Sequence, residues 1–197
     1  MIRSTEPFES ILGAMRKGAG ALKDAGVPFL LGGGLACSAR GGPPTDHDVD
    51  FLVRPEHAES GLEALARAGM ETERPPEHWL YKAYDDGILV DLIFEPSGLR
   101  VNEGMFTRAE ELEVRAVRMW VASLDDVVTT KLMALSEQDL DYRAVLEIAR
   151  TLREQIDWTW VRDQTVRSPY AKAFFTLVEE LGIQPDAYRP IRAARSR

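Results

Sequence analysis

Three aspartates set among apolar residues are the side chains of this sequence best suited to chemistry. Asp48 and Asp50 alternate with apolar residues in the segment DVDFLV at 48–53, and Asp91 interrupts the apolar segment ILVDLIF at 88–94. Side chains alternate along a β-strand, so Asp48 and Asp50 point to one face, about 6.6 Å apart. A carboxylate among apolar neighbours is costly unless a positive charge compensates it.

Divalent cations are the natural neutraliser of such a group. If the two segments are neighbouring strands, three carboxylates converge, and Mg²⁺ or Mn²⁺ takes oxygen ligands while keeping positions for water and phosphate. Two such ions, about 3.5–4 Å apart and bridged by carboxylates, serve in-line nucleotidyl transfer. The alternative is a solvated Asp-X-Asp pair at a strand edge. The position of Asp91 in mid-strand and a glycine turn upstream favour the metal site.

The glycine turn, Gly32–Gly34, follows the apolar segment VPFLL at 27–31 and precedes LACSAR at 35–40. Backbone N–H groups at a strand-to-helix turn can face a phosphate. Gly33 and Gly34 are therefore candidate nucleotide-binding residues, and Ser38 is a candidate to add its hydroxyl. The alternatives are glycines that only allow close packing and a plain surface serine. The turn lacks the Lys-Ser/Thr ending of a P-loop.

Strands and helices alternate up to about residue 122. Hydrophobic periodicity predicts helices at 8–25, 35–40 and 55–68. It predicts strands at 27–31, 48–53, 78–84, 88–94 and 114–123, with the hairpin turn DDG joining the third and fourth. The predicted fold class is α+β, a mixed β-sheet flanked by helices, with residues 1–122 as the core domain.

The remaining residues, 123–197, are predicted to form a C-terminal helical portion packed on that core. Ser123, with Asp126 three residues later, is typical of a helix start for the segment up to residue 135. Further helices are predicted in 139–155, 157–164 and 169–182.

The order of these motifs resembles the polymerase-beta-like nucleotidyltransferase superfamily. Its pattern is a hydrophobic residue, Gly, Gly or Ser, a spacer of about nine to thirteen residues, and then Asp-hydrophobic-Asp. Counted from Gly34, residues 35–47 form the spacer; counting from Gly32–Gly33 lengthens it by one residue. Asp46-His47-Asp48 is a rival acid pair, but His47 is a poor fit for a core position.

Residues 123–146 are similar to the helical segment of small bacterial nucleotidyltransferases, both antibiotic-modifying and toxin-type. In those proteins a lysine on this helix faces the nucleotide and an acid begins the next helix, which implies Lys131 and Asp139, with Asp141 as the alternative. The relatives often carry an arginine where this chain has Pro43. Either Arg40 substitutes for it, or triphosphate binding is weaker.

The resemblance implies a metal-dependent nucleotidyltransferase that moves an NMP from an NTP to a hydroxyl acceptor. It implies that Asp48, Asp50 and Asp91 are catalytic and hold Mg²⁺ or Mn²⁺. The implied acceptor is a small molecule, tRNA or protein. Two alternatives stay open: a toxin-type enzyme restrained by an antitoxin, and a non-catalytic nucleotide-binding module on the same fold.

Composition narrows the partners. The formal net charge of the 197 residues is −8, which favours a small molecule or a protein over a nucleic acid. No apolar run approaches the ~18 residues of a membrane span. The single cysteine, Cys37, excludes an internal disulfide and fits a reducing cytoplasm. Trp79 and Tyr81 alternate on one predicted strand, where they either border the acceptor site or fill the core.

Overall fold

The computed structural model describes residues 6–43, 45 and 48–183. Within them, seven strands form one mixed sheet in the order β3-β4-β5-β2-β1-β7-β6. The strands are β1 (Phe29–Leu31), β2 (Asp48–Val53), β3 (Glu71–Glu73), β4 (Leu80–Asp85), β5 (Ile88–Ile93), β6 (Glu110–Val114) and β7 (Val117–Val121).

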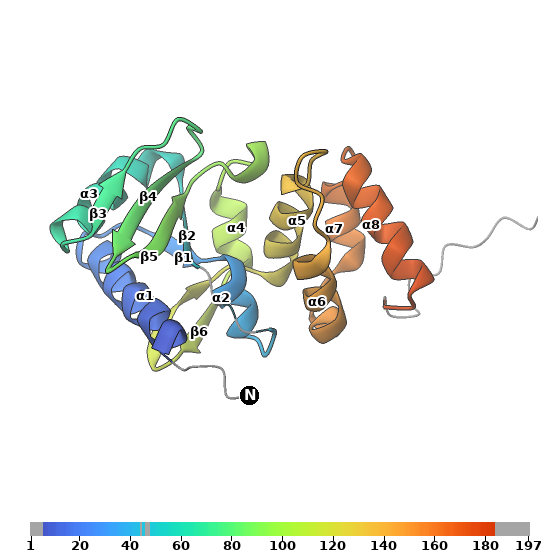
Figure 1. The fold of residues 1–197 in the computed structure, drawn as a ribbon, viewed down its shortest axis with the longest axis horizontal. Helices are drawn as coiled ribbons and strands as arrows, with labels where there is room; N and C mark the ends of the chain where they lie inside the picture. Colours follow the sequence, from blue (N-terminus) through green and yellow to red (C-terminus); the bar gives the residue numbers. More distant parts are fainter. Residues whose placement is uncertain (1–5, 44, 46–47, 184–197) are drawn as a thin grey trace, which may run out of the picture.

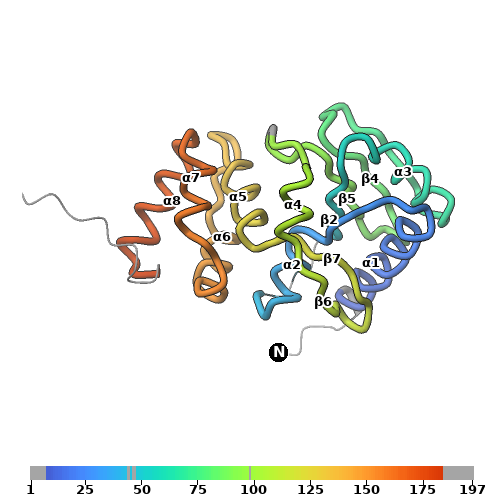
Figure 2. Tube along the Cα trace, turned by 180° about the vertical axis from the view of Figure 1, so that it is seen from behind, coloured from blue at the N-terminus to red at the C-terminus, as the bar shows by residue number. Residues whose placement is uncertain are grey.

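Helices α1 and α3 lie against the sheet, α2 and α4 lie in the middle of the molecule, and α5 to α8 gather at the side away from α1 and α3 (Figure 1). Helices α1 and α3 pack on β2, β4 and β5, whereas α5 contacts α2 and the later helices α6, α7 and α8. Figure 2 shows the same arrangement from behind. The helices are α1 (Glu6–Asp24), α2 (Gly33–Ser38), α3 (Ala58–Arg67), α4 (Glu103–Arg108), α5 (Leu124–Ala134), α6 (Arg143–Thr151), α7 (Trp158–Gln164) and α8 (Pro169–Glu180).

Strand β2 is the centre of the sheet. It pairs antiparallel with β1 and parallel with β5, and the parallel register sets Asp50 opposite Asp91. Successive side chains of β2 point to opposite faces of the sheet. Phe51 lies against α1, since a Cβ added at Gly18 would be 2.7 Å from its ring, whereas the aspartates point to the opposite face.

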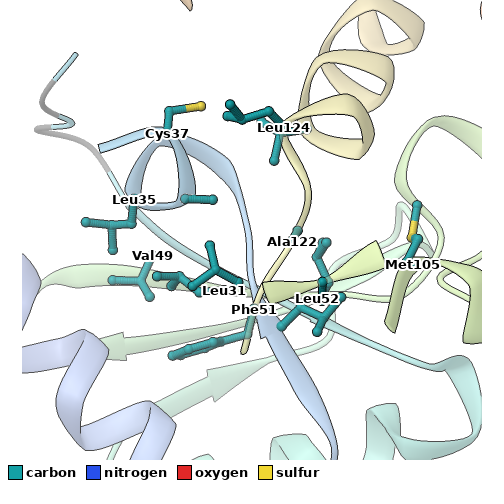
Figure 3. Close-up of a cluster of buried hydrophobic side chains, with 14 of the residues drawn as sticks. Leu31, Leu35, Cys37, Val49, Phe51, Leu52, Met105, Ala122 and Leu124 are labelled. Carbon is teal, nitrogen blue, oxygen red and sulfur yellow. The ribbon is translucent and has the colours of Figure 1, made fainter. Parts of the chain in front are cut away.

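An apolar layer joins α2 to the sheet (Figure 3). Its side chains come from β1, α2, β2 and the entry to α5, and nearly all are completely buried. They include Leu31, Leu35, Cys37, Val49, Phe51, Ala122 and Leu124. Burial of each large side chain contributes about 1.5–3 kcal/mol, so this cluster stabilises α2 and the strands β1 and β2 together.

Local signals in the sequence explain several element ends. The β4–β5 hairpin turns at Asp86 and Gly87, whose φ angles of 49° and 82° fit the tight turn predicted from DDG. Ser123 caps α5, because its Oγ accepts a hydrogen bond from the N–H of Asp126 at 3.1 Å.

The prediction of a single strand at 114–123 is wrong. Two antiparallel strands, β6 and β7, meet at a turn formed by Arg115 and Ala116, with φ angles of 49° and 67°. These left-handed angles normally call for Gly, Asn or Asp, and neither residue signals such a turn. The edge strand β3 and helix α4 were not expected either, and all three residues of β3 are exposed.

The helices after Ser123 share a second apolar cluster. Trp158, Phe174 and Phe175 are buried. The ring centroids of the two phenylalanines are 5.9 Å apart, and those of Trp158 and Phe175 are 6.3 Å apart. Aromatic pairs at such separations add to the stability gained from burial alone. None of the helices within the described residues is both long and apolar enough to span a bilayer.

Candidate active site

The structure brings Asp48, Asp50 and Asp91 together. One carboxylate oxygen from each lies within 4.8 Å of the others. The parallel register explains this, because Asp50 and Asp91 are directly paired and register partners share a face about 4.8 Å apart. Asp48 lies on the same face, two residues earlier on β2.

Electrostatics at this group favour a bound cation. Burial, and after it the nearby Asp48 charge, raise the pKa of the Asp91 carboxyl to about 6, while Lys82 opposes the shift. Burial also raises the pKa of Asp50, again reinforced by Asp48 and opposed by Lys131. The Oδ1 atom of Asp91 is buried and has no hydrogen-bond partner among the described residues. Mg²⁺ and Mn²⁺ prefer oxygen ligands such as these carboxylates, so the three aspartates fit a divalent ion.

The glycine turn lies directly over this group. Gly33 has a φ of +53°, and a Cβ at this position would overlap Asp50 Oδ2. A Cβ on Gly34 would lie 2.7 Å from Thr45 Cβ. Both positions therefore require glycine, Gly33 for its backbone angle and for space and Gly34 for space alone. The turn brings backbone N–H groups at the start of α2 close to the carboxylates.

A cavity of about 400 Å³ opens beside the turn. Asp48, Asp50 and Gly34 line one side of it, and Lys131 of α5 adds a cation. This volume lies within the range of ordinary small-ligand sites, about 300–1,000 Å³. A glycine turn, a lysine and a pair of carboxylates thus face one space.

Two predicted nucleotide-binding residues lie elsewhere. Ser38 is the last residue of α2 and does not line the cavity. Asp139 lies in the exposed loop between α5 and α6, where its N–H donates to Ser136 Oγ at 3.1 Å. The alternative, Asp141, is exposed, and its Oδ1 accepts from the N–H of Arg143 at the start of α6 at 2.8 Å. Neither acid lines the cavity.

Arg40 also points away from the cavity. Its guanidinium donates to Val121 O and to Glu110 Oε2, both at 3.4 Å, and its side chain is buried. These contacts join the end of α2 to β6 and β7. Pro43 lines the cavity instead, so no arginine of this loop replaces the one expected from the resemblance.

Sequence reasoning missed four residues that line the cavity. Thr45 is buried against Gly34, and its loop carries no periodic signal. Ala144, Glu147 and Ile148 of α6 also line the cavity. The helical spacing of 144, 147 and 148 shows that they share one face, but only the tertiary packing of α6 directs that face to the carboxylates.

Comparisons with known proteins agree with this geometry. The structure of the antibiotic-resistance factor ANT(2'')-Ia is similar, with a TM-score of 0.56 and 12% identity over 88% of this chain and 97% of that one. ANT(2'')-Ia in complex with adenylyl-2''-tobramycin gives a TM-score of 0.54 at 12% identity, covering 91% of this chain and 99% of that one. A Thermotoga maritima protein described as a candidate nucleotidyltransferase gives a TM-score of 0.52 at 18% identity. The match covers 92% of this chain and 96% of that one.

At these identities the similarity shows the fold, and the predicted nucleotidyltransferase-type α+β fold is confirmed. A comparison with curated protein sequences gives no match. A family profile described as "Nucleotidyl transferase of unknown function (DUF2204)" matches residues 11–173, which is most of the 197-residue chain. The match spans the glycine turn, all three aspartates and helices α5 to α7, and the chain therefore belongs to the DUF2204 family of nucleotidyl transferases.

Proposed function

We propose that the chain moves an NMP from an NTP to a hydroxyl acceptor in a reaction that depends on a divalent metal ion. The observation that carries the proposal is the convergence of Asp48, Asp50 and Asp91 beside a cavity that also holds a glycine turn and a lysine. Family membership supports the reaction type, and the unpartnered Asp91 oxygen supports the metal.

In this reaction the acceptor oxygen attacks the α-phosphorus of the NTP. A new phosphorus–oxygen bond forms as the bond from that phosphorus to the bridging oxygen breaks, and pyrophosphate leaves with the bonding electron pair. The hydroxyl proton passes to Asp91 or to water. Such transfers require mainly positioning and charge neutralisation, and little covalent chemistry from side chains.

The chain's residues divide these tasks. Asp48 and Asp50 would hold an ion that also binds the NTP phosphates, and all three aspartates would hold a second one near the acceptor. When bound, the divalent ions neutralise phosphate charge and favour the ionised form of the acceptor hydroxyl. Lys131 contacts the phosphates as a point charge, and the turn at Gly33 and Gly34 presents N–H donors to them.

A small-molecule acceptor is favoured over tRNA or protein. The chain's net charge of −8 opposes nucleic acid binding. The structurally similar ANT(2'')-Ia was solved with an adenylylated small molecule, which supports ATP as the nucleotide and a small acceptor here. No observation favours an antitoxin partner. The proposed location is the cytoplasm, supported by the lone cysteine, Cys37.

The test uses the full-length chain with each NTP labelled at the α-phosphate, with Mg²⁺ or Mn²⁺, and with separate small-molecule, RNA and protein pools. We expect label to appear in the small-molecule pool and to disappear with EDTA. Asp50→Asn should abolish transfer, whereas Asp86→Asn, an exposed turn residue, should not. Metal-independent transfer, or transfer that persists in Asp50→Asn, contradicts the proposal.

A further inference from the structure

Lys82 lies beside the three aspartates, on the side away from the glycine turn. Strand β4 pairs antiparallel with β5, and the register sets Lys82 opposite Asp91. Register partners point to the same face of a sheet whose strands are about 4.8 Å apart, so Lys82 shares a face with Asp91 and with Asp50 on the next strand. Lys82 and Asp91 are close enough for the lysine charge to act on the carboxyl. The three residues therefore form one row across β4, β5 and β2.

The ammonium of Lys82 is available to a bound anion. The residue is half-buried, and no hydrogen bond or ion pair joins its side chain to another residue in the described part of the chain. Glu73, its register partner on β3, accepts a hydrogen bond from Tyr84 OH at 3.3 Å instead. A divalent ion at the aspartates would neutralise Asp91, the other acid opposite Lys82. A half-buried lysine without a counterion gains from an anionic ligand, to which it presents a point charge and three donors.

The sheet face that carries Lys82 is partly exposed beside β5. Helices α1 and α3 pack on the opposite face, where Tyr81 OH donates a hydrogen bond to Glu59 of α3 at 2.7 Å. Tyr81 and Lys82 are neighbours on β4, so their side chains point to opposite faces. Tyr84 and Leu89, register partners on β4 and β5, lie on the Lys82 face and are partly exposed. A small molecule can therefore pack on this ring and this aliphatic side chain while it contacts Lys82.

The geometry of the reaction places the acceptor on this side of the aspartates. Gly34 and Lys131, which are assigned to the NTP phosphates, line the cavity beside the glycine turn, whereas Lys82 and Asp91 do not. In an in-line displacement the attacking and leaving oxygens lie on opposite sides of the phosphorus. With pyrophosphate held at the glycine turn, the acceptor oxygen approaches from the side of β5 and β4. Lys82 therefore faces the acceptor rather than the leaving group.

We propose that Lys82 binds the acceptor, and that the acceptor is a small hydroxylated molecule carrying a carboxylate or a phosphate near the reacting hydroxyl. This inference rests on the proposed function for the meaning of "acceptor", whereas the preference for an anion rests on the unpaired ammonium of Lys82. The ammonium donates hydrogen bonds to the anionic group, the body of the molecule packs on Tyr84 and Leu89, and the hydroxyl reaches the metal-binding aspartates.

The test measures binding without turnover. The probes are D-glucuronate and D-glucose 6-phosphate, paired with their neutral counterparts D-glucuronamide and D-glucose. Each is titrated calorimetrically into the full-length protein in Mg²⁺, both alone and with α,β-methylene-ATP, an analogue that fills the nucleotide site but cannot transfer its nucleotidyl group. We expect the charged member of at least one pair to bind about tenfold more tightly than its neutral partner, because a hydrogen bond to a charged group contributes about that much. The pair that responds distinguishes a carboxylate from a phosphate.

Variants of Lys82 assign the preference to this side chain. Lys82→Met should remove the difference between charged and neutral probes, whereas Lys82→Arg, which keeps the charge, should retain most of it. In label transfer, Lys82→Met should raise KM for the acceptor about tenfold and leave KM for the NTP unchanged, a split that a purely structural role would not produce. The control is Lys172→Met, at an exposed position of α8, which should bind all four probes as the wild type does. Circular dichroism of each variant confirms folding.

The outcomes separate this inference from the proposed function. The inference is overturned if neither charged probe binds at millimolar concentration, if charged and neutral probes bind equally, or if Lys82→Met retains the preference. If the charged probes bind through Lys82 but α,β-methylene-ATP does not bind and no NTP transfers label, the proposed function fails and the anion site stands. If label passes to an acceptor that an anion-exchange resin does not retain, the proposed function stands and this inference fails.

Discussion

Asp91→Asn is expected to stabilise the metal-free protein at neutral pH while it abolishes transfer. The carboxyl of Asp91 has a pKa of about 6 in the folded chain, against 3.8 for the free side chain. Because the folded-state value is the higher one, the folded chain binds more protons, and stability falls as pH rises from about 4 to about 6. The raised pKa of Asp91 thus lowers the free energy of unfolding by about 3 kcal/mol at pH 7.5 and by roughly half as much at pH 5.

An asparagine carries no charge at either pH, so it avoids this cost. Urea unfolding in EDTA should therefore show Asp91→Asn more stable than wild type by up to about 3 kcal/mol at pH 7.5, with roughly half the gain at pH 5. The control, Asp86→Asn, changes the same atoms at an exposed turn with a φ of +49°, which asparagine tolerates. It should shift stability by less than about 0.5 kcal/mol at both pH values.

Added Mg²⁺ should reduce the stability difference between wild type and Asp91→Asn. It binds the folded wild type and stabilises it by mass action, whereas the variant has lost one ligand. The gap between the two proteins should therefore narrow or change sign at pH 7.5 in millimolar Mg²⁺. The reasoning is refuted if metal-free Asp91→Asn is no more stable than wild type at pH 7.5, or if its gain is the same at both pH values.

Two further substitutions test the turn and the lysine. Gly33→Ala should lower the free energy of unfolding by about 1–3 kcal/mol and reduce transfer, because its Cβ would displace Asp50 at a left-handed φ. The control Gly20→Ala in α1, with open space around it, should be neutral or stabilising. Urea unfolding and label transfer are measured for both variants. Lys131→Met should raise KM for the NTP about tenfold or more through a lost phosphate contact, while the exposed Lys172→Met should leave KM unchanged; equal KM values in the two variants would contradict the role of Lys131.

The sequence predicted the acid pair and the third aspartate because both signals are local. An alternation of Asp48, Val49, Asp50 and Phe51 fixes which side chains share a face, and Asp91 is conspicuous among apolar neighbours. The direct pairing of Asp50 with Asp91 is a long-range property of the β2–β5 register. No pattern within either strand specifies that register, so convergence remained a conditional expectation until the fold was known.

Local reasoning failed where tertiary contacts decide the outcome. Arg115 and Ala116 adopt left-handed angles because the β6–β7 pairing requires a two-residue turn, although their own preferences oppose it. Asp139 was expected at the start of a helix, yet α6 begins at Arg143, with the Asp141 side chain accepting its N–H. Glu147 faces the cavity only because of the way α6 packs beside α5.

Helix α5 is the element that places Lys131 at the cavity beside the glycine turn. The Ser123 cap holds the start of the helix. Asp126, which is buried, also pairs with Arg108, whose Nη2 lies 2.6 Å from Asp126 Oδ1. Lys131 lies on the same helix, so contacts made at the start of α5 help to set its position at that cavity.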